Sequence, residues 1–229
     1  MEVSSFRKMK SSNVFFSIRK LVIVVTGLSC YPVYSQIGDD RLNFTMEAAL
    51  PSGRANPAYR NYLNGLINAQ PKLQYRFAKT LFVAAGARYS YYTVSEFKVP
   101  QKTTGGANTF GGFVEIGWTK WQTPRFGLEF SLKTGFAQHV FITGLTRETG
   151  IQRVTAPFVQ PTISLVLAAD EAVAYRWILG YNIDGFDFKP YHLGMNTMDG
   201  YSESDLSKPS QSLLVGFAFT YYFGNERSE

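Results

Sequence analysis

The chain has 229 residues, a length typical of one domain, and its mean hydropathy is −0.11. A membrane-spanning helix needs about 18 consecutive apolar residues, and no apolar run in the sequence is that long. The sequence therefore excludes a helical membrane protein. The net charge is +6, but +4 of it lies in residues 1–35. The remaining +2 gives no electrostatic footprint for nucleic acid, and we expect no such partner.

Residues 1–35 have the organisation of a secretory signal peptide. A basic region ends at Arg19 and Lys20, and an apolar segment, 21–30, follows it. Val33 and Ser35 stand at the −3 and −1 positions of a cleavage site before Gln36. The sequence therefore predicts two parts, a signal peptide (1–35) and a mature domain (36–229).

Two other interpretations of this N-terminus are weaker. An uncleaved anchor helix is disfavoured because the apolar segment is too short. A lipoprotein cleaved at Cys30 is disfavoured because Gly27-Leu28-Ser29 fits a lipobox poorly. Translation starting at Met9 instead of Met1 stays open. Cys30 is the only cysteine, so we expect neither a disulfide nor a thiolate metal site in the mature chain.

Eight segments in the rest of the chain alternate apolar and small or polar residues with the period of a β-strand. In 126–136, for example, Phe130 and Leu132 share one face while Glu129 and Lys133 share the other. The apolar faces of the eight segments carry no charge, whereas the opposite faces carry ten charged residues. The segments are 41–50, 71–77, 81–92, 110–118, 126–136, 159–168, 173–184 and 212–223. Pro161 lies on an apolar face, where we expect a bulge or the start of a strand.

The connections alternate in length, which predicts an antiparallel up-and-down barrel. The short ones are 78–80, 119–125 and 169–172, and the long ones are 51–70, 93–108, 137–158 and 185–211. Aromatic residues gather near both ends of the strands, as interfacial girdles require. We expect short turns on the periplasmic side and long loops outside the cell.

The first long connection contains a helix signal. Asn56 is a suitable cap, Pro57 suits the first turn, and apolar residues follow at helical spacing as far as Ile67. The helix could lie on the rim of the barrel, or it could serve as a plug or a docking element. The last connection, 185–211, is rich in Gly and Pro and predicts an irregular loop.

The signal peptide, the eight alternating segments, the alternation of turns and loops, and the final Phe223 together resemble small bacterial outer-membrane barrels of the OmpA and OmpX kind. The resemblance covers residues 41–223. It implies an all-β transmembrane barrel in a Gram-negative outer membrane, in contact with lipid and lipopolysaccharide and inserted by the barrel-assembly machinery. The alternative is a soluble, lipocalin-like barrel with its charged face outward, which the small residues on the charged face and the terminal aromatic disfavour.

Because an eight-stranded barrel is only wide enough to be filled by side chains, its inward charges must satisfy one another. We expect Glu115 near Arg88, and Glu129 near Arg176 or Lys133. The network could be structural filling, or it could be a gated path for protons or ions. The predicted lumen charge network comprises Glu47, Arg76, Arg88, Glu115, Glu129, Lys133 and Arg176, and the remaining inward charges are Arg41, Lys72 and Asp184.

Catalysis has little support in the sequence. Some barrels of this size are lipid A deacylases with a His and a Ser two residues apart, but neither His139 nor His192 has a serine at that spacing. Ser202, Ser204 and Asp205 share the last long loop with His192, so a triad stays geometrically open. We predict no enzyme, no cofactor and no metal.

Three functions remain compatible with the sequence. The first is a structural or accessory outer-membrane barrel, such as a subunit of a larger secretion or assembly complex, with protein partners bound through the extracellular loops. The second is a narrow channel or carrier for small solutes. The third is a lipid-modifying enzyme of the outer membrane.

Overall fold

The computed structural model describes residues 41–195 and 200–223. The predicted signal peptide, its cleavage site before Gln36 and the choice of start codon lie outside these residues and stay predictions.

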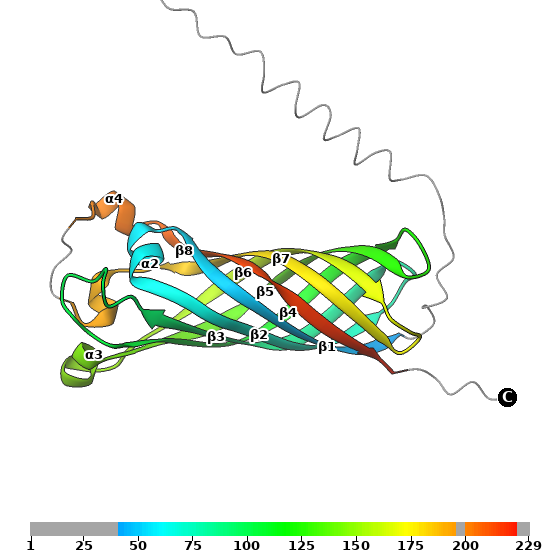
Figure 1. Cartoon of the computed structure of the whole chain (residues 1–229), viewed down its shortest axis with the longest axis horizontal. Coiled ribbons are helices and arrows are strands. Elements are labelled where there is room, and N and C mark those ends of the chain that lie inside the picture. Colours follow the sequence, from blue (N-terminus) through cyan, green and yellow to red (C-terminus); the bar gives the residue numbers. More distant parts are fainter. Residues whose placement is uncertain (1–40, 196–199, 224–229) are drawn as a thin grey trace, which may run out of the picture. The chain divides into compact units, whose positions relative to one another are not determined.

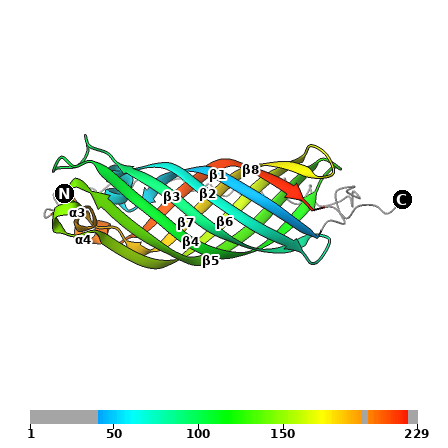
Figure 2. The ribbon, with the colours of Figure 1, turned by 90° about the horizontal axis from the view of Figure 1, so that it is seen from below.

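Eight antiparallel strands form a closed barrel (Figures 1 and 2). Each strand pairs with its neighbours along the chain, and β8 returns to pair with β1. The predicted eight-stranded, all-β barrel is therefore confirmed. The strands are β1 (Leu42–Ala55), β2 (Leu63–Arg76), β3 (Leu81–Val94), β4 (Gly105–Trp121), β5 (Phe126–Thr143), β6 (Gln152–Ala168), β7 (Val173–Asp187) and β8 (Pro209–Tyr222).

The two ends of the barrel differ. At the helix end, the connections carry α2 (Pro57–Tyr62), α3 (Gly144–Thr149), the 3-10 helix η1 (Pro190–Leu193) and α4 (Glu203–Leu206). At the turn end, the strands are joined by residues 77–80, 122–125 and 169–172, and β1 begins and β8 ends there. None of the helices in the described part of the chain is long and apolar enough to cross a membrane.

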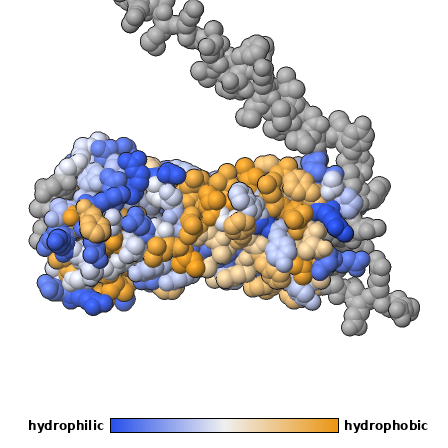
Figure 3. All heavy atoms as spheres, in the orientation of Figure 1, coloured by the Kyte–Doolittle hydropathy of each residue, from blue (hydrophilic) through white to orange (hydrophobic). Residues whose placement is uncertain are grey.

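The predicted assignment of faces is confirmed. On β5, Phe130 is 43% exposed, whereas its neighbour Glu129 is buried. Phe217 on β8 is 59% exposed, and Ala218 is buried. The outward side chains form a belt of large apolar residues around the strands, with hydrophilic surface at both ends (Figure 3).

The strands run further than the sequence predicted, chiefly toward the helix end. β2 begins at Leu63 instead of 71, and β5 continues to Thr143 instead of 136. Pro161 marks neither a bulge nor a strand start, because it lies within β6 and faces outward. The β6–β7 ladder omits Gln160 and Pro161, but it resumes at Thr162 in the same register. Proline has no backbone N–H to donate, so it opens the ladder without shifting it.

The predicted cap of α2 is confirmed, but the helix is shorter than predicted. The Asn56 side chain accepts a hydrogen bond from the Tyr59 N–H at 3.0 Å. The helix ends at Tyr62, because Leu63 is extended and pairs with Val94 of β3. A ladder that satisfies backbone groups on both strands outweighs the weak helical preference of the following residues.

The interior of the barrel has three layers. At the helix end, α2, η1 and α4 cover the strands, and their side chains join an apolar cluster that includes Tyr59, Phe141, Phe188, Leu193 and Leu206. The middle is polar and charged. At the turn end, a second apolar cluster contains Val166, Ala168, Ala174 and Tyr222, with Trp121 packed against it.

Candidate functional site in the barrel lumen

Four charged side chains form a continuous chain of ion pairs in the middle of the lumen. Lys72 Nζ lies 2.7 Å from Glu47 Oε1 and 2.7 Å from Glu115 Oε2. Lys133 Nζ lies 2.5 Å from the other Glu47 oxygen and donates to Gln70 Oε1 at 2.6 Å. All of these side chains are buried, so each of the four charged groups in this series of ion pairs has an opposite charge in place of the water it has lost.

Strand register explains this arrangement. Glu115 on β4 lies directly opposite Lys133 on β5, and Glu47 on β1 lies opposite Gln70 on β2. Residues opposite each other on one face of a sheet have neighbouring Cβ atoms, and the long lysine side chains span the narrow lumen from there. Lys72, an inward base outside the predicted network, joins both glutamates.

A second charged group lies nearer the turn end. Arg176 forms an ion pair with Glu129, which confirms one of the two predicted alternatives for that glutamate. Thr119 donates a hydrogen bond to Glu129 at 3.0 Å, and Arg176 Nε donates to Thr220 Oγ1 at 2.9 Å. The hydroxyl groups therefore satisfy the atoms that the ion pair leaves free.

A third charged group lies toward the helix end. Arg88 donates to both oxygens of Asp184, at 2.9 and 3.3 Å, and to Asn182 at 2.9 Å. His139 Nε2 lies 3.7 Å from Asp184, and His139 Nδ1 lies 2.9 Å from the Thr109 hydroxyl. Asp184, an inward acid absent from the predicted network, is the partner of Arg88.

The predicted contact between Glu115 and Arg88 is wrong. Their strands are adjacent, but Arg88 pairs with Gly111 whereas Glu115 pairs with Ala84. The two residues are thus offset by four positions along the strands, or about 13 Å at the rise of a β-strand. Adjacent strands place side chains on one face; only the register decides which of them meet.

Two of the predicted inward charges, Arg41 and the predicted network member Arg76, do not join the network. Arg41 lies just before the start of β1 and is exposed, so the first inward residue of that strand is Asn43. Arg76 faces inward and is buried, but no carboxylate of the described residues lies within ion-pair distance of it.

The residues considered for a catalytic triad do not form one. His192 lies in the apolar cluster, stacked on Phe141 with ring centroids 5.2 Å apart, and its Nδ1 accepts the Lys189 N–H at 3.0 Å. Burial lowers the pKa of His192 to about 4. The Ser202 hydroxyl instead contacts Ser204 and Asp205, both at 2.9 Å. The described geometry therefore gives His192 a capping role.

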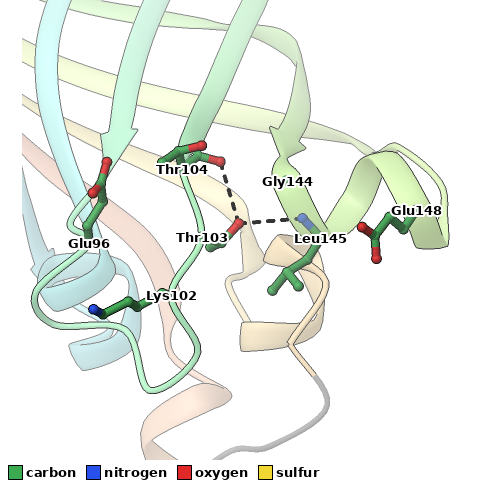
Figure 4. A pocket seen from close by; sticks show the side chains of 7 residues that line it. All are labelled: Glu96, Lys102, Thr103, Thr104, Gly144, Leu145 and Glu148. Carbon is green, nitrogen blue, oxygen red and sulfur yellow. Dashed lines mark hydrogen bonds between the residues drawn. The ribbon is translucent and has the colours of Figure 1, made fainter.

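An open pocket of about 440 Å³ lies at the helix end, between the 95–104 connection and α3 (Figure 4). Its charged side chains, Glu96, Lys102 and Glu148, are exposed, and the Thr103 hydroxyl accepts the Leu145 N–H at 3.4 Å. Within residues 41–195 and 200–223, no three His, Cys, Asp or Glu side chains come together as metal ligands do. The lining residues are Glu96, Lys102, Thr103, Thr104, Gly144, Leu145 and Glu148.

No protein-family model matches the chain, and no curated protein matches it. Several solved structures do. Neisserial surface protein A matches with a TM-score of 0.53 and 12% identity, over 80% of this chain and 97% of that one. Ail of Yersinia pestis, in complex with the heparin analogue sucrose octasulfate, matches with a TM-score of 0.48 and 9% identity, over 79% and 97%. OprG, an outer-membrane protein of Pseudomonas aeruginosa, matches with a TM-score of 0.46 and 11% identity, over 81% and 99%.

The match to Neisserial surface protein A supports the fold, and identities this low support nothing finer. The structure adds the belt. Val114, Trp177 and Phe217 are each more than half exposed, and a continuous apolar surface of this kind requires lipid around it. The chain is therefore a small eight-stranded barrel of the outer membrane.

Proposed function

We propose that this chain is a non-conducting outer-membrane barrel with a structural or accessory role, and that its turn end faces the periplasm. One observation carries the proposal: the ion-pair chain Glu115–Lys72–Glu47–Lys133 crosses the middle of a lumen that eight strands leave no wider than its side chains. The apolar cluster under α2, η1 and α4 supports it, because it fills the helix end as a protein core does.

Conductance across planar bilayers tests this proposal against the channel. We expect the folded, full-length mature chain to insert and to pass no steady current, because a continuous water column would have to displace buried ion pairs. An open porin in the same bilayers serves as the positive control. A stable single-channel conductance of the unmodified protein would contradict the proposal and favour the channel.

The accessory role is favoured by exposed aromatic side chains at the helix end. Phe97 is fully exposed in the 95–104 connection, and Tyr191 in η1 is 53% exposed. Both lie outside the strands, and aromatic side chains on a surface that faces water are typical of protein–protein contacts.

Purification in mild detergent tests this role. We expect a defined partner to co-elute with the unmodified protein and to be lost when Phe97 and Tyr191 are both replaced by serine. The control is Tyr175→Ser, which changes an aromatic residue in the belt and leaves the helix end intact. Identical elution of the double variant and the unmodified protein would contradict an accessory role at this surface.

A further inference from the structure

One buried cation at the turn end forms no ion pair with any carboxylate of residues 41–195 and 200–223. Arg76 is the last residue of β2 and is 6% exposed. The other inward Lys and Arg side chains each form an ion pair with a buried carboxylate, and together they use all four inward acids of the described strands. Those pairs join Lys72, Lys133, Arg88 and Arg176 to Glu47, Glu115, Asp184 and Glu129.

Polar side chains with unused hydrogen-bonding atoms share the turn end of the lumen with Arg76. Asn43 lies opposite Gln74 in the β1–β2 ladder and opposite Tyr222 in the β1–β8 ladder. Gln74 shares the inward face of β2 with Arg76, two residues away. All three neighbours are buried to 1% exposure or less.

The unused atoms are mostly donors. Within the described part of the chain, Asn43 Nδ2, Gln74 Nε2, Arg76 Nε and the Tyr222 hydroxyl have no hydrogen-bond partner, and neither has Gln74 Oε1. Trp121 packs against the cluster that contains Tyr222, and its buried Nε1 is also without a partner there. Unpartnered polar atoms in a protein interior are costly, and a group of them at one place indicates a ligand that satisfies them.

We propose that the turn end of the lumen is a carboxylate-binding site, with the Arg76 guanidinium paired to the carboxylate and the Asn43, Gln74, Trp121 and Tyr222 donors around it. A guanidinium presents its N–H groups in a fork that fits a carboxylate. One positive charge with no partner carboxylate among the described residues calls for one negative charge, which a single carboxylate supplies. The amide and indole N–H groups fit the same ligand, since they donate.

The carboxylate has two possible sources. Asp39 and Asp40 precede Arg41 in the sequence, only a few residues before Asn43. The other source is a free or peptide carboxylate in the compartment that the turn end faces. The chemistry is the same in both cases, and the experiment below separates them.

The fluorescence of Trp121, which is part of the proposed site, reports binding. Trp118→Phe and Trp177→Phe leave Trp121 as the only tryptophan in the mature chain, folded in detergent micelles. Sodium acetate is titrated at constant ionic strength, with acetamide as the uncharged control. We expect a saturable change in Trp121 emission with acetate and none with acetamide. Arg76→Gln should weaken acetate binding by about tenfold or more, as the loss of a charge-assisted hydrogen bond does.

Matched variants keep the result interpretable. Arg41→Gln removes an exposed arginine at the same end and should leave the titration unchanged. Gln74→Leu tests the site without removing its charge. It should weaken binding while the barrel stays folded, as judged by its heat-dependent shift on gels. If Arg76→Gln fails to fold, the effect of Gln74→Leu on acetate binding alone decides whether the proposed site binds the carboxylate.

The titration is repeated with Asp39 and Asp40 both changed to asparagine. Saturation by acetate in the unmodified chain supports an external carboxylate. Saturation only after both aspartates are changed supports occupation by the chain's own carboxylate. The proposal is overturned if acetate has no saturable effect in either protein, which would leave only water at these donors, or if acetamide or Arg76→Gln gives the same response.

Discussion

The middle of the barrel and its helix end are built by the same strands with opposite chemistry. In the middle of β7, Trp177 and Leu179 face outward and Arg176 faces inward. At the helix end of the same strand, Asp187 is exposed, while Phe186 and the following Phe188 are buried in the apolar cluster. β6 changes in the same way, with Arg153 exposed and Ala156 buried in that cluster.

The surroundings explain the reversal. Lipid is as apolar as the side chains in the belt, so burying apolar groups inside the lumen gains little there, and inward polar groups are held by pairing. Beyond the belt, the outer surface meets water. The interior must then be apolar for the hydrophobic effect to hold the structure together. The helix end therefore has a core like that of a soluble protein.

The largest effect should come from Glu47→Ala in the middle of the lumen. Glu47 contacts both Lys72 and Lys133, so its removal leaves buried positive charge uncompensated. We expect the free energy of unfolding to fall by roughly 3–5 kcal/mol, measured from urea titrations in lipid vesicles. Glu203→Ala, at the exposed start of α4, is the control and should leave the urea midpoint unchanged. Equal midpoints for the two variants would show that the ion pairs do not hold the lumen.

The next effect separates the two regions on a single strand. Phe141 and Phe136 both lie on β5, but Phe141 is 1% exposed in the helix-end core, whereas Phe136 is 67% exposed in the belt. Phe141→Ala should cost about 3 kcal/mol, because it leaves a cavity among packed side chains. Phe136→Ala should cost much less, since lipid fills the space. Equal losses would contradict the view of the helix end as a packed core.

The reversal also explains which parts of the fold the sequence could predict. The eight segments and their faces were predictable, because charge is excluded from every lipid-facing position. The helix-end extensions were not, because there the apolar residues change to the other face. On β7, Ile183 is the last apolar outward residue before Gly185 and Asp187, and the predicted strand stopped at 184. For the same reason, the sequence pattern did not predict residues 152–158 as part of β6.

The ion pairs were predictable only in part, for a different reason. The inward face of Glu129, Arg176 and Lys133 follows from alternation, but which side chains meet depends on the stagger between strands. That stagger is set around the whole closed barrel, not by any one segment. Arg88 accordingly meets Asp184 from across the lumen instead of Glu115 on the adjacent strand.

A smaller effect concerns pH at the helix end. His192 has a pKa of about 4 in the folded protein, below its ordinary value of 6.5, because it is buried. When the loop that carries His192 unfolds locally, His192 therefore binds a proton more readily than it does in the folded loop. The stabilisation by neutral His192 is complete above pH 6.5 and is lost as the pH falls toward 4.

Hydrogen exchange of residues 188–195, corrected for intrinsic rates, measures this effect. Protection should be lower near pH 5 than at neutral pH, and His192→Gln should reduce the difference, because glutamine does not titrate. An unchanged pH dependence in that variant would assign the effect to another group.

The smallest effect tests the wall of the barrel within the belt. The β6–β7 ladder omits Gln160 and Pro161 and keeps one register on both sides of them, while the β5–β6 ladder pairs both of them, with Lys133 and Leu132. The N–H that Pro161 lacks would therefore point toward β7, near Tyr181. In lipid no water replaces the missing hydrogen bond. Pro161→Val should restore it and raise the free energy of unfolding by about 1 kcal/mol, with slower amide exchange confined to this part of β6 and β7.

Pro71→Val offers an independent repeat, because the β2–β3 ladder also omits Pro71 and resumes in the same register at Lys72. Unchanged exchange in both variants would mean that the gaps come from the curvature of the barrel instead of the missing donor.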